Sequence, residues 1–172
     1  MDKEKQERIE KAAKAAYEFQ CRDDVCSRST LAGLAEVFDF IPECLVTASA
    51  SLCGGTGSAS GSCGAYCAGL LAVGLKYNAS IAQEQAAPDD DVFGATTAPR
   101  FSEFRDRFKA QFGTVLCPEI HKKLFGKAYQ LDTPEGQQAF FELEGHVERC
   151  GTVVAAAARL AAEMILEGED QQ

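Results

Sequence analysis

The sequence lacks a long apolar segment, since its longest uninterrupted one, residues 65–75, is far shorter than the ~20 residues that a membrane span needs. Positive charge is also scarce, because 17 Lys and Arg stand against 26 Asp and Glu, which gives a net charge of −9. A nucleic-acid-binding face would need a surplus of Lys and Arg. The composition therefore predicts no membrane span and no nucleic-acid partner.

Two further features are missing: an apolar leader and any pair of cysteines in C-x-x-C spacing. The first residues, MDKEKQERIEK, are too charged for a secretory signal, so we expect a cytoplasmic location. Cysteines there are normally reduced, so the eight cysteines are not expected to form four structural disulfides. Without C-x-x-C, the zinc-ribbon, thioredoxin and linear ferredoxin patterns are excluded. Any metal or redox site must be assembled by the fold.

Apolar residues recur at helical spacing along most of the chain, and no segment shows the alternation typical of a strand. Residues 3–20 and 27–40 predict helices, and Pro42 separates the second from a third. The 172 residues suffice for one core. We therefore expect residues 1–172 to form a single all-α domain, a bundle of five to seven helices.

The C-terminal half contains two clear core-facing patterns and one expected loop. Phenylalanines at helical spacing mark the helix that follows residue 100, and an apolar seam runs from Phe140 to Met164. Gly145 and Gly151 are the positions expected to split or bend that last helix. The seam allows a homodimer without requiring one. Residues 86–99, AAPDDDVFGATTAP, are expected to form a mobile loop.

Three cysteines fall where helices are expected to begin. Cys26 lies at the start of the second helix. Cys63 directly follows Ser62, which is the expected N-cap of the next helix, and Cys117 directly precedes Pro118 at another expected helix start. The partial positive charge and free N–H groups of a helix N-terminus lower the pKa of a thiol, so these positions favour redox or ligand chemistry. Cys150 lies on the apolar seam, near the expected start of the last helix.

Core packing is the alternative for every one of these cysteines, because free cysteine behaves as a small hydrophobic residue. It is the expectation for Cys21, Cys44 and Cys53, which have no comparable placement. The two histidines, His121 and His146, are expected to be exposed, so histidine-based acid–base chemistry has little support.

The glycine-rich segment 54–61 is expected to be a loop. It misses the G-x-G-x-x-G register, and neither a preceding strand nor a Walker lysine accompanies it, so a nucleotide site is not predicted. Gly54 and Gly55 instead allow the backbone to approach a buried group, with N–H groups forming an anion nest beside the Cys63 thiolate.

Taken in order and spacing, several of these segments resemble the C_GCAxxG_C_C family of redox-active proteins, over residues 15–166. The segments that carry the resemblance are Cys26 with SRSTL, the 54–57 loop, Cys63 with GA and the following GLLAVGLKY, Phe112–Gly113 with Cys117 and PEI, and Arg149 with Cys150. The chain departs from the pattern at Ala68, where glycine is expected, and adds Cys67 at a position that the pattern leaves open.

The resemblance implies a small bacterial or archaeal protein that works in redox chemistry or holds a prosthetic group such as an iron–sulfur cluster. It also implies that the family's four cysteines are Cys26, Cys63, Cys117 and Cys150. These four are the expected redox thiols, and with Gly54 and Gly55 they are the expected cofactor-binding residues.

Two versions of this redox function follow from the pattern. In one, the four thiolates bind an iron–sulfur cluster or another metal, with Cys67 as an additional candidate ligand. In the other, the thiols cycle through disulfides with Cys63 as nucleophile, opposite a redox partner protein that the sequence does not identify. Soft-metal binding or storage of copper or zinc, and a structural helical interaction module with packing cysteines, are the alternatives.

Overall fold

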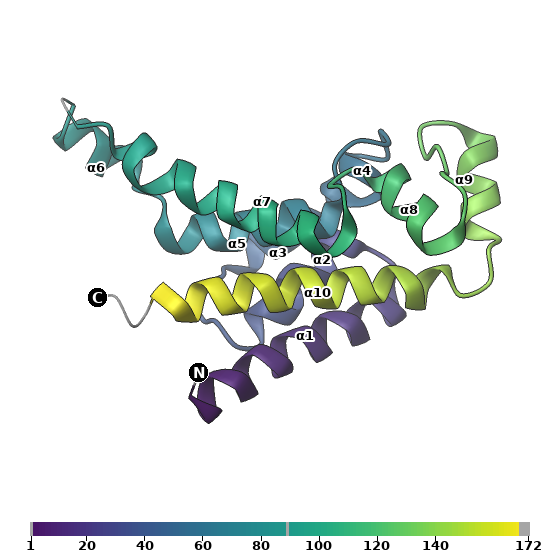
Figure 1. The fold of residues 1–172 in the computed structure, drawn as a ribbon, viewed down its shortest axis with the longest axis horizontal. Coiled ribbons are helices and arrows are strands. Elements are labelled where there is room, and N and C mark those ends of the chain that lie inside the picture. The colour runs from purple at the N-terminus through teal and green to yellow at the C-terminus, as the bar shows by residue number, and fades with distance from the viewer. Residues whose placement is uncertain (1, 89, 169–172) are drawn as a thin grey trace.

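The computed structural model describes residues 2–88 and 90–168, which form an all-α domain (Figure 1). Among those residues no strand forms, and an isolated antiparallel bridge pairs Ser62 with Leu116. The expectation of a single all-α domain is confirmed.

Helices of ten residues or more make up the bundle within the described ranges. They are α1 (Lys3–Asp23), α2 (Cys26–Ala35), α5 (Gly64–Tyr77), α7 (Ala98–Phe112) and α10 (His146–Glu167). Shorter helical segments fill the connections. They are α3 (Glu43–Ser49), the 3₁₀ turn η1 (Ala50–Leu52), α4 (Cys53–Thr56), α6 (Ile81–Ala86), the π-helical turn η2 (Phe93–Thr97), α8 (Cys117–Phe125) and α9 (Pro134–Phe141).

The two longest of these helices, α1 and α10, lie side by side; α2 packs against both of them, and α5 packs against α10 and α2 (Figure 1). Alanines such as Ala12, Ala16, Ala157 and Ala161 are completely buried and bring the helices close together. The apolar seam expected in the last helix therefore lies inside the core of one chain. Because other helices of the same chain already cover this seam, it is not available as a dimer interface. A homodimer remains a prediction.

The phenylalanine pattern of α7 meets α5 through stacked rings. Phe104 and Phe108 are fully buried, with ring centroids 5.8 and 5.2 Å from that of Tyr66. Such aromatic pairs add to the burial of apolar area. They attach α7 to the bundle, while α6 and the adjoining end of α7 project from it (Figure 1).

Two boundaries differ from those expected. The second helix ends at Ala35 rather than at residue 40, although Phe38 still enters the core. The segment 86–99 contains the η2 turn and the start of α7, where Pro99 stands in the first turn and its fixed φ suits a helix. Its mobility stays a prediction.

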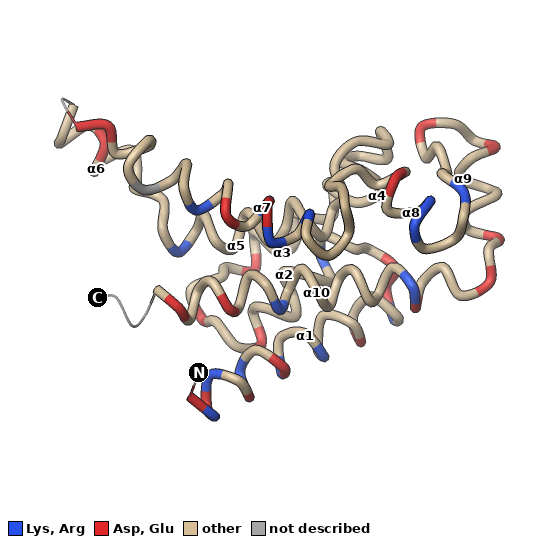
Figure 2. Tube along the Cα trace, in the orientation of Figure 1, with Lys and Arg blue, Asp and Glu red and all other residues tan. Residues whose placement is uncertain are grey.

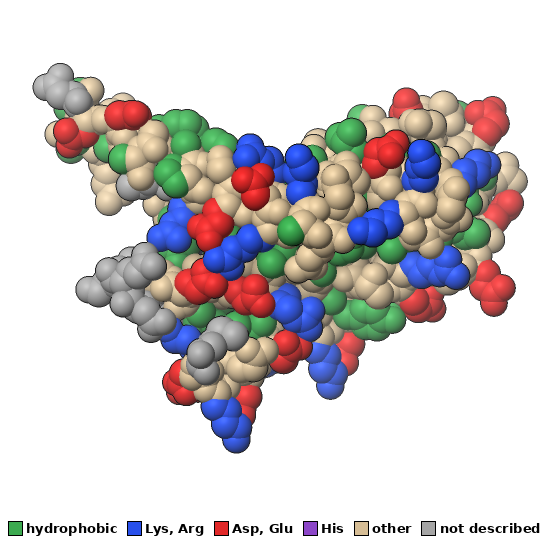
Figure 3. All heavy atoms as spheres, viewed as in Figure 1, with side chains coloured by type: hydrophobic (Ala, Val, Ile, Leu, Met, Phe, Trp, Pro, Cys, Tyr) green, Lys and Arg blue, Asp and Glu red, His purple; other side chains and the backbone are tan. Residues whose placement is uncertain are grey.

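Charged side chains of both signs alternate along the outer faces of α1 and α10, and Figure 3 shows them interspersed over that side of the molecule (Figure 2). Residues 45–75 carry no charged side chain at all. This uncharged segment runs from α3 through α4 and along α5 as far as Leu75. None of the described helices is both long and apolar enough to cross a membrane.

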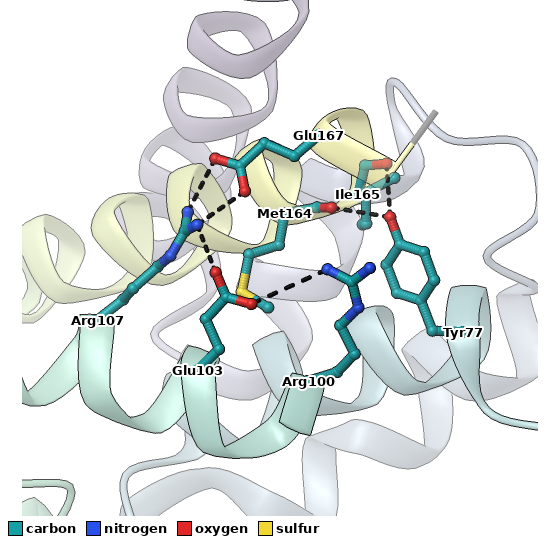
Figure 4. Close-up of polar contacts among 7 residues, drawn as sticks. All are labelled: Tyr77, Arg100, Glu103, Arg107, Met164, Ile165 and Glu167. Atoms are coloured by element: carbon teal, nitrogen blue, oxygen red, sulfur yellow. Dashed lines mark hydrogen bonds and ion pairs between the residues drawn. The ribbon is translucent and has the colours of Figure 1, made fainter. Parts of the chain in front are cut away.

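Polar contacts join α7 and α5 to the end of α10 (Figure 4). The guanidinium of Arg107 donates to both carboxylate oxygens of Glu167, at 3.0 and 2.7 Å, and also to Glu103. The hydroxyl of Tyr77 donates to the carbonyl oxygens of Met164 and Ile165, at 2.8 and 2.9 Å. These contacts fix the position of the last turn of α10 relative to α5 and α7.

The replacement Arg107→Ala is expected to lower the free energy of unfolding by about 1 kcal/mol or less, because partly exposed ion pairs are screened by water and salt. Urea unfolding at low and high salt measures this, and the difference should shrink at high salt. The replacement Arg105→Ala is the matched control on the same helix, because Arg105 forms its ion pair with the adjacent, exposed Asp106 rather than with another helix. A salt-independent loss well above 2 kcal/mol would contradict this account.

Candidate functional site

Residues of α4, α8 and the first turns of α10 line a cavity of about 80 Å³. These elements lie toward one end of the bundle (Figure 1). The cavity wall combines apolar side chains with a concentration of sulfur. The cysteines that line it are Cys26, Cys53, Cys63, Cys117 and Cys150. These come from α2, α4, the start of α5, α8 and α10, so the fold brings distant segments of the chain to one point.

Helix starts position three of these cysteines. Cys26 and Cys117 are the first residues of α2 and α8, and Cys63 is itself the N-cap of α5. The expected capping role of Ser62 is wrong, because Ser62 pairs instead with Leu116 in the isolated bridge. Cys150 lies in the second turn of α10, after the split at Gly145 that the sequence predicts.

The bridge explains why two of the cysteines meet. The backbone N–H of Cys63 donates to the carbonyl of Val115 at 2.8 Å, and the N–H of Cys117 donates to the carbonyl of Gly61 at 2.9 Å. These paired bonds bind the start of α5 to the start of α8. The two thiols are thereby held on the same wall of the cavity.

The glycine loop approaches a thiol, but not the expected one. Gly54 lines the cavity with a φ of 65°, a conformation that favours glycine, and its N–H points at the sulfur of Cys26 rather than that of Cys63. Gly55 also has a positive φ, and it stabilises the loop by accepting a bond from the Gly61 N–H at 2.9 Å. Gly55 is not one of the described residues that line the cavity.

Gly64 lies directly against the Cys26 thiol, although the sequence pattern gave no reason to assign it to the site. A Cβ atom there would lie 2.6 Å from the Leu52 carbonyl oxygen and 2.8 Å from the sulfur of Cys26. Both distances are shorter than real Cβ contacts. Only glycine therefore lets the start of α5 pack this closely against the Cys26 thiol.

Burial decides the protonation of the thiols. Together with repulsion among the neighbouring sulfurs, it raises the pKa of Cys26, Cys63 and Cys117 to about 12 and that of Cys150 well above its usual value. The expectation of lowered pKa values at helix starts is wrong, because loss of hydration outweighs the N–H groups that face the sulfurs of Cys26 and Cys63. The thiols are thus neutral near pH 7.

His121 is buried in the cavity wall, so the expectation that it is exposed is wrong. It is 3% exposed and stacks on the ring of Phe140 with centroids 4.4 Å apart. Its Nε2 lies 3.5 Å from the sulfur of Cys117, one helical turn earlier in α8. Burial lowers the pKa of His121 to about 4. The i,i+4 spacing between Cys117 and His121 is the sequence feature that could have predicted that His121 lies in the cavity wall.

His146 is also turned inward, contrary to expectation, and takes part in a polar network at the cavity. Its Nε2 lies 3.1 Å from Asp24, whose other carboxylate oxygen accepts a 2.8 Å bond from the amide of Gln20. Because a carboxylate only accepts, the nitrogen of that amide faces Asp24. The Gln20 carbonyl oxygen is then left buried without a hydrogen-bond partner in the described part of the chain.

A scan against protein-family models matches residues 25–164 to the family described as "Putative redox-active protein (C_GCAxxG_C_C)". The chain belongs to this family. The resemblance drawn from the sequence is therefore confirmed, and the match covers all four cysteines assigned to the family pattern. No curated protein and no solved structure matches the chain.

The four family cysteines line the cavity, whereas three of the other four described cysteines do not. Cys21 and Cys44 are exposed, so the expectation that they pack in the core is wrong, whereas Cys53 lines the cavity instead of simply filling the core. The sulfur of Cys67 lies 3.7 Å from the hydroxyl of Thr56. Cys67 does not line the cavity, as far as the described residues show.

All eight cysteines are free thiols. Within residues 2–88 and 90–168, no three Cys, His, Asp or Glu side chains are grouped so that they could hold one ion. A single metal ion needs its ligands about 2.0–2.3 Å from one point, so it would require side chains of the cavity to move. The donor set itself, soft sulfur with one buried imidazole, suits iron, zinc or copper.

Proposed function

We propose that this member of the C_GCAxxG_C_C family is an electron-transfer protein that holds an iron–sulfur-type centre. One observation carries the proposal. The four family cysteines come from four segments far apart in the sequence and line the same cavity. These cysteines are Cys26, Cys63, Cys117 and Cys150.

The surroundings of the thiols support a bound centre. Backbone N–H groups of Ser27 and Gly54 face the sulfur of Cys26, and those of Ala65 and Tyr66 face the sulfur of Cys63. Hydrogen bonds to sulfur and exclusion of solvent tune the reduction potential of such centres. An iron–sulfur cluster held there would supply one-electron transfer.

The raised thiol pKa values favour this version over disulfide cycling. The attacking species in thiol–disulfide exchange is the thiolate, and a thiol with a pKa of about 12, such as Cys63, is almost entirely protonated near pH 7. A metal instead displaces the proton directly when it binds, so loading should release protons and weaken as the pH falls. The redox partner protein stays unidentified.

Anaerobic purification, followed by reconstitution with iron and sulfide, tests the proposal. We expect at least one iron per chain, a comparable amount of sulfide, and absorbance near ~400 nm. The replacement Cys63→Ser should abolish most of this absorbance. The control is Cys44→Ser, which removes an exposed cysteine outside the cavity.

Fewer than one iron per chain, or equal loading of the Cys63→Ser and Cys44→Ser variants, would overturn the cluster. Several copper ions per chain after copper loading, lost in Cys63→Ser, would favour soft-metal storage instead. If neither iron nor copper binds through the cavity thiols, the structural interaction module becomes the better account.

A further inference from the structure

The cavity contains a nitrogen donor that the family pattern does not name. His121 and Cys117 stand at i and i+4 on α8, so both side chains share one face of the helix, and both line the cavity. The Nε2 atom of His121 lies 3.5 Å from the sulfur of Cys117. A sulfur and an imidazole nitrogen are therefore already paired at the wall.

This separation is the one that a tetrahedral metal ion imposes. Such an ion binds a thiolate at ~2.3 Å and an imidazole nitrogen at ~2.0–2.1 Å, which places the two donor atoms roughly 3.6 Å apart. The Cys117–His121 pair meets this distance without a change in α8. Movement is then needed only from the donors on other segments.

We propose that Cys117 and His121 form a chelating pair, so that the centre in this cavity has a mixed sulfur and nitrogen ligand set. The inference rests on the proposed function, because it assumes a metal centre in the cavity. It adds an imidazole ligand from α8 to the thiolates. Because an imidazole is neutral, the centre is less negative than one in which a thiolate fills the same position, and its reduction potential is higher.

The surroundings of His121 hold the ring in the required position. The ring lies nearly parallel to that of Phe140, with an interplanar angle of 15°, and contacts the edges of Phe125 and Tyr129. The backbone of Tyr129 lies within reach of the ring as a hydrogen-bond acceptor, although the buried Nδ1 atom has no partner of full hydrogen-bond geometry among the described residues. A ligand role for Nε2 explains why a polar ring is kept inside an aromatic pocket.

Titration of the metal-free, full-length protein with Co²⁺ under anaerobic conditions tests this chelate. Wild type should show thiolate-to-cobalt charge transfer together with visible bands of a mixed sulfur and nitrogen site. His121→Phe, which keeps an aromatic ring against Phe140, should shift these bands and weaken Co²⁺ binding at least tenfold. His121→Cys should restore tight binding, with bands moved to those of an all-sulfur site.

His146→Ala is the control, since it removes the other histidine without touching α8. Unchanged bands and affinity in His121→Phe, with normal thiolate charge transfer, would overturn the chelate and leave the proposed function standing. Absence of thiolate charge transfer in wild type would also overturn the chelate, whereas the iron and sulfide content after reconstitution decides the proposed function separately. Should His121→Phe fail to fold, the His121→Cys bands decide, because an unchanged spectrum there also overturns the chelate.

Discussion

The replacement Gly64→Ala is expected to destabilise the protein by about 2–4 kcal/mol and to reduce metal loading of the cavity strongly. The added methyl group would meet the Leu52 carbonyl oxygen at 2.6 Å and the Cys26 sulfur at 2.8 Å. The first of these neighbours is a backbone atom of η1, so relief requires α5 to move away from η1. Urea unfolding and iron content after anaerobic reconstitution measure the two effects.

Gly74→Ala is the matched control on the same helix. The atoms nearest to its methyl group would belong to the side chain of Asn78, at 3.0 Å, and alanine is the better helix former by about 1 kcal/mol. We expect unchanged or slightly higher stability and normal loading for this variant. If Gly64→Ala loaded metal as well as Gly74→Ala, the close packing of α5 against the Cys26 thiol would have no role in the site.

The metal-free protein is expected to lose stability steeply between about pH 9 and pH 12. Buried thiols such as Cys26, Cys63 and Cys117 stay protonated in the folded state up to a pKa of about 12, whereas unfolding exposes thiols that ionise near their usual value of 9.0. The folded state then binds more protons, so raising the pH favours unfolding. Each such thiol contributes about 1.4 kcal/mol per pH unit in that window.

Urea unfolding at several pH values, with and without Cys63→Ala, checks this expectation. The variant should show a shallower decline above pH 9, whatever its stability at pH 7. Cys44→Ala serves as the control, because it removes an exposed cysteine that does not line the cavity. Equal slopes for Cys63→Ala and wild type would show that burial does not suppress the Cys63 thiolate.

Local patterns in the sequence identified much of the architecture because helices depend on neighbouring residues. Periodic apolar residues predict α1, α7 and α10, and the split at Gly145 lies where the sequence places it. Helix boundaries were less predictable at α2, which ends at Ala35. There, packing of the following turn against the core, with Phe38 buried, overrides the continued helical pattern.

By itself, the sequence determined the all-α class, the placement of Cys26 and Cys117 at helix starts, and membership of the redox family through spaced segments. Tertiary structure alone decided that Cys53 lines the cavity with them while Cys67 does not, and that His121 faces the same space. It also reversed the expected direction of the thiol pKa shifts. The physical reason is that shared cavities and desolvation depend on contacts between distant segments, which local spacing does not contain.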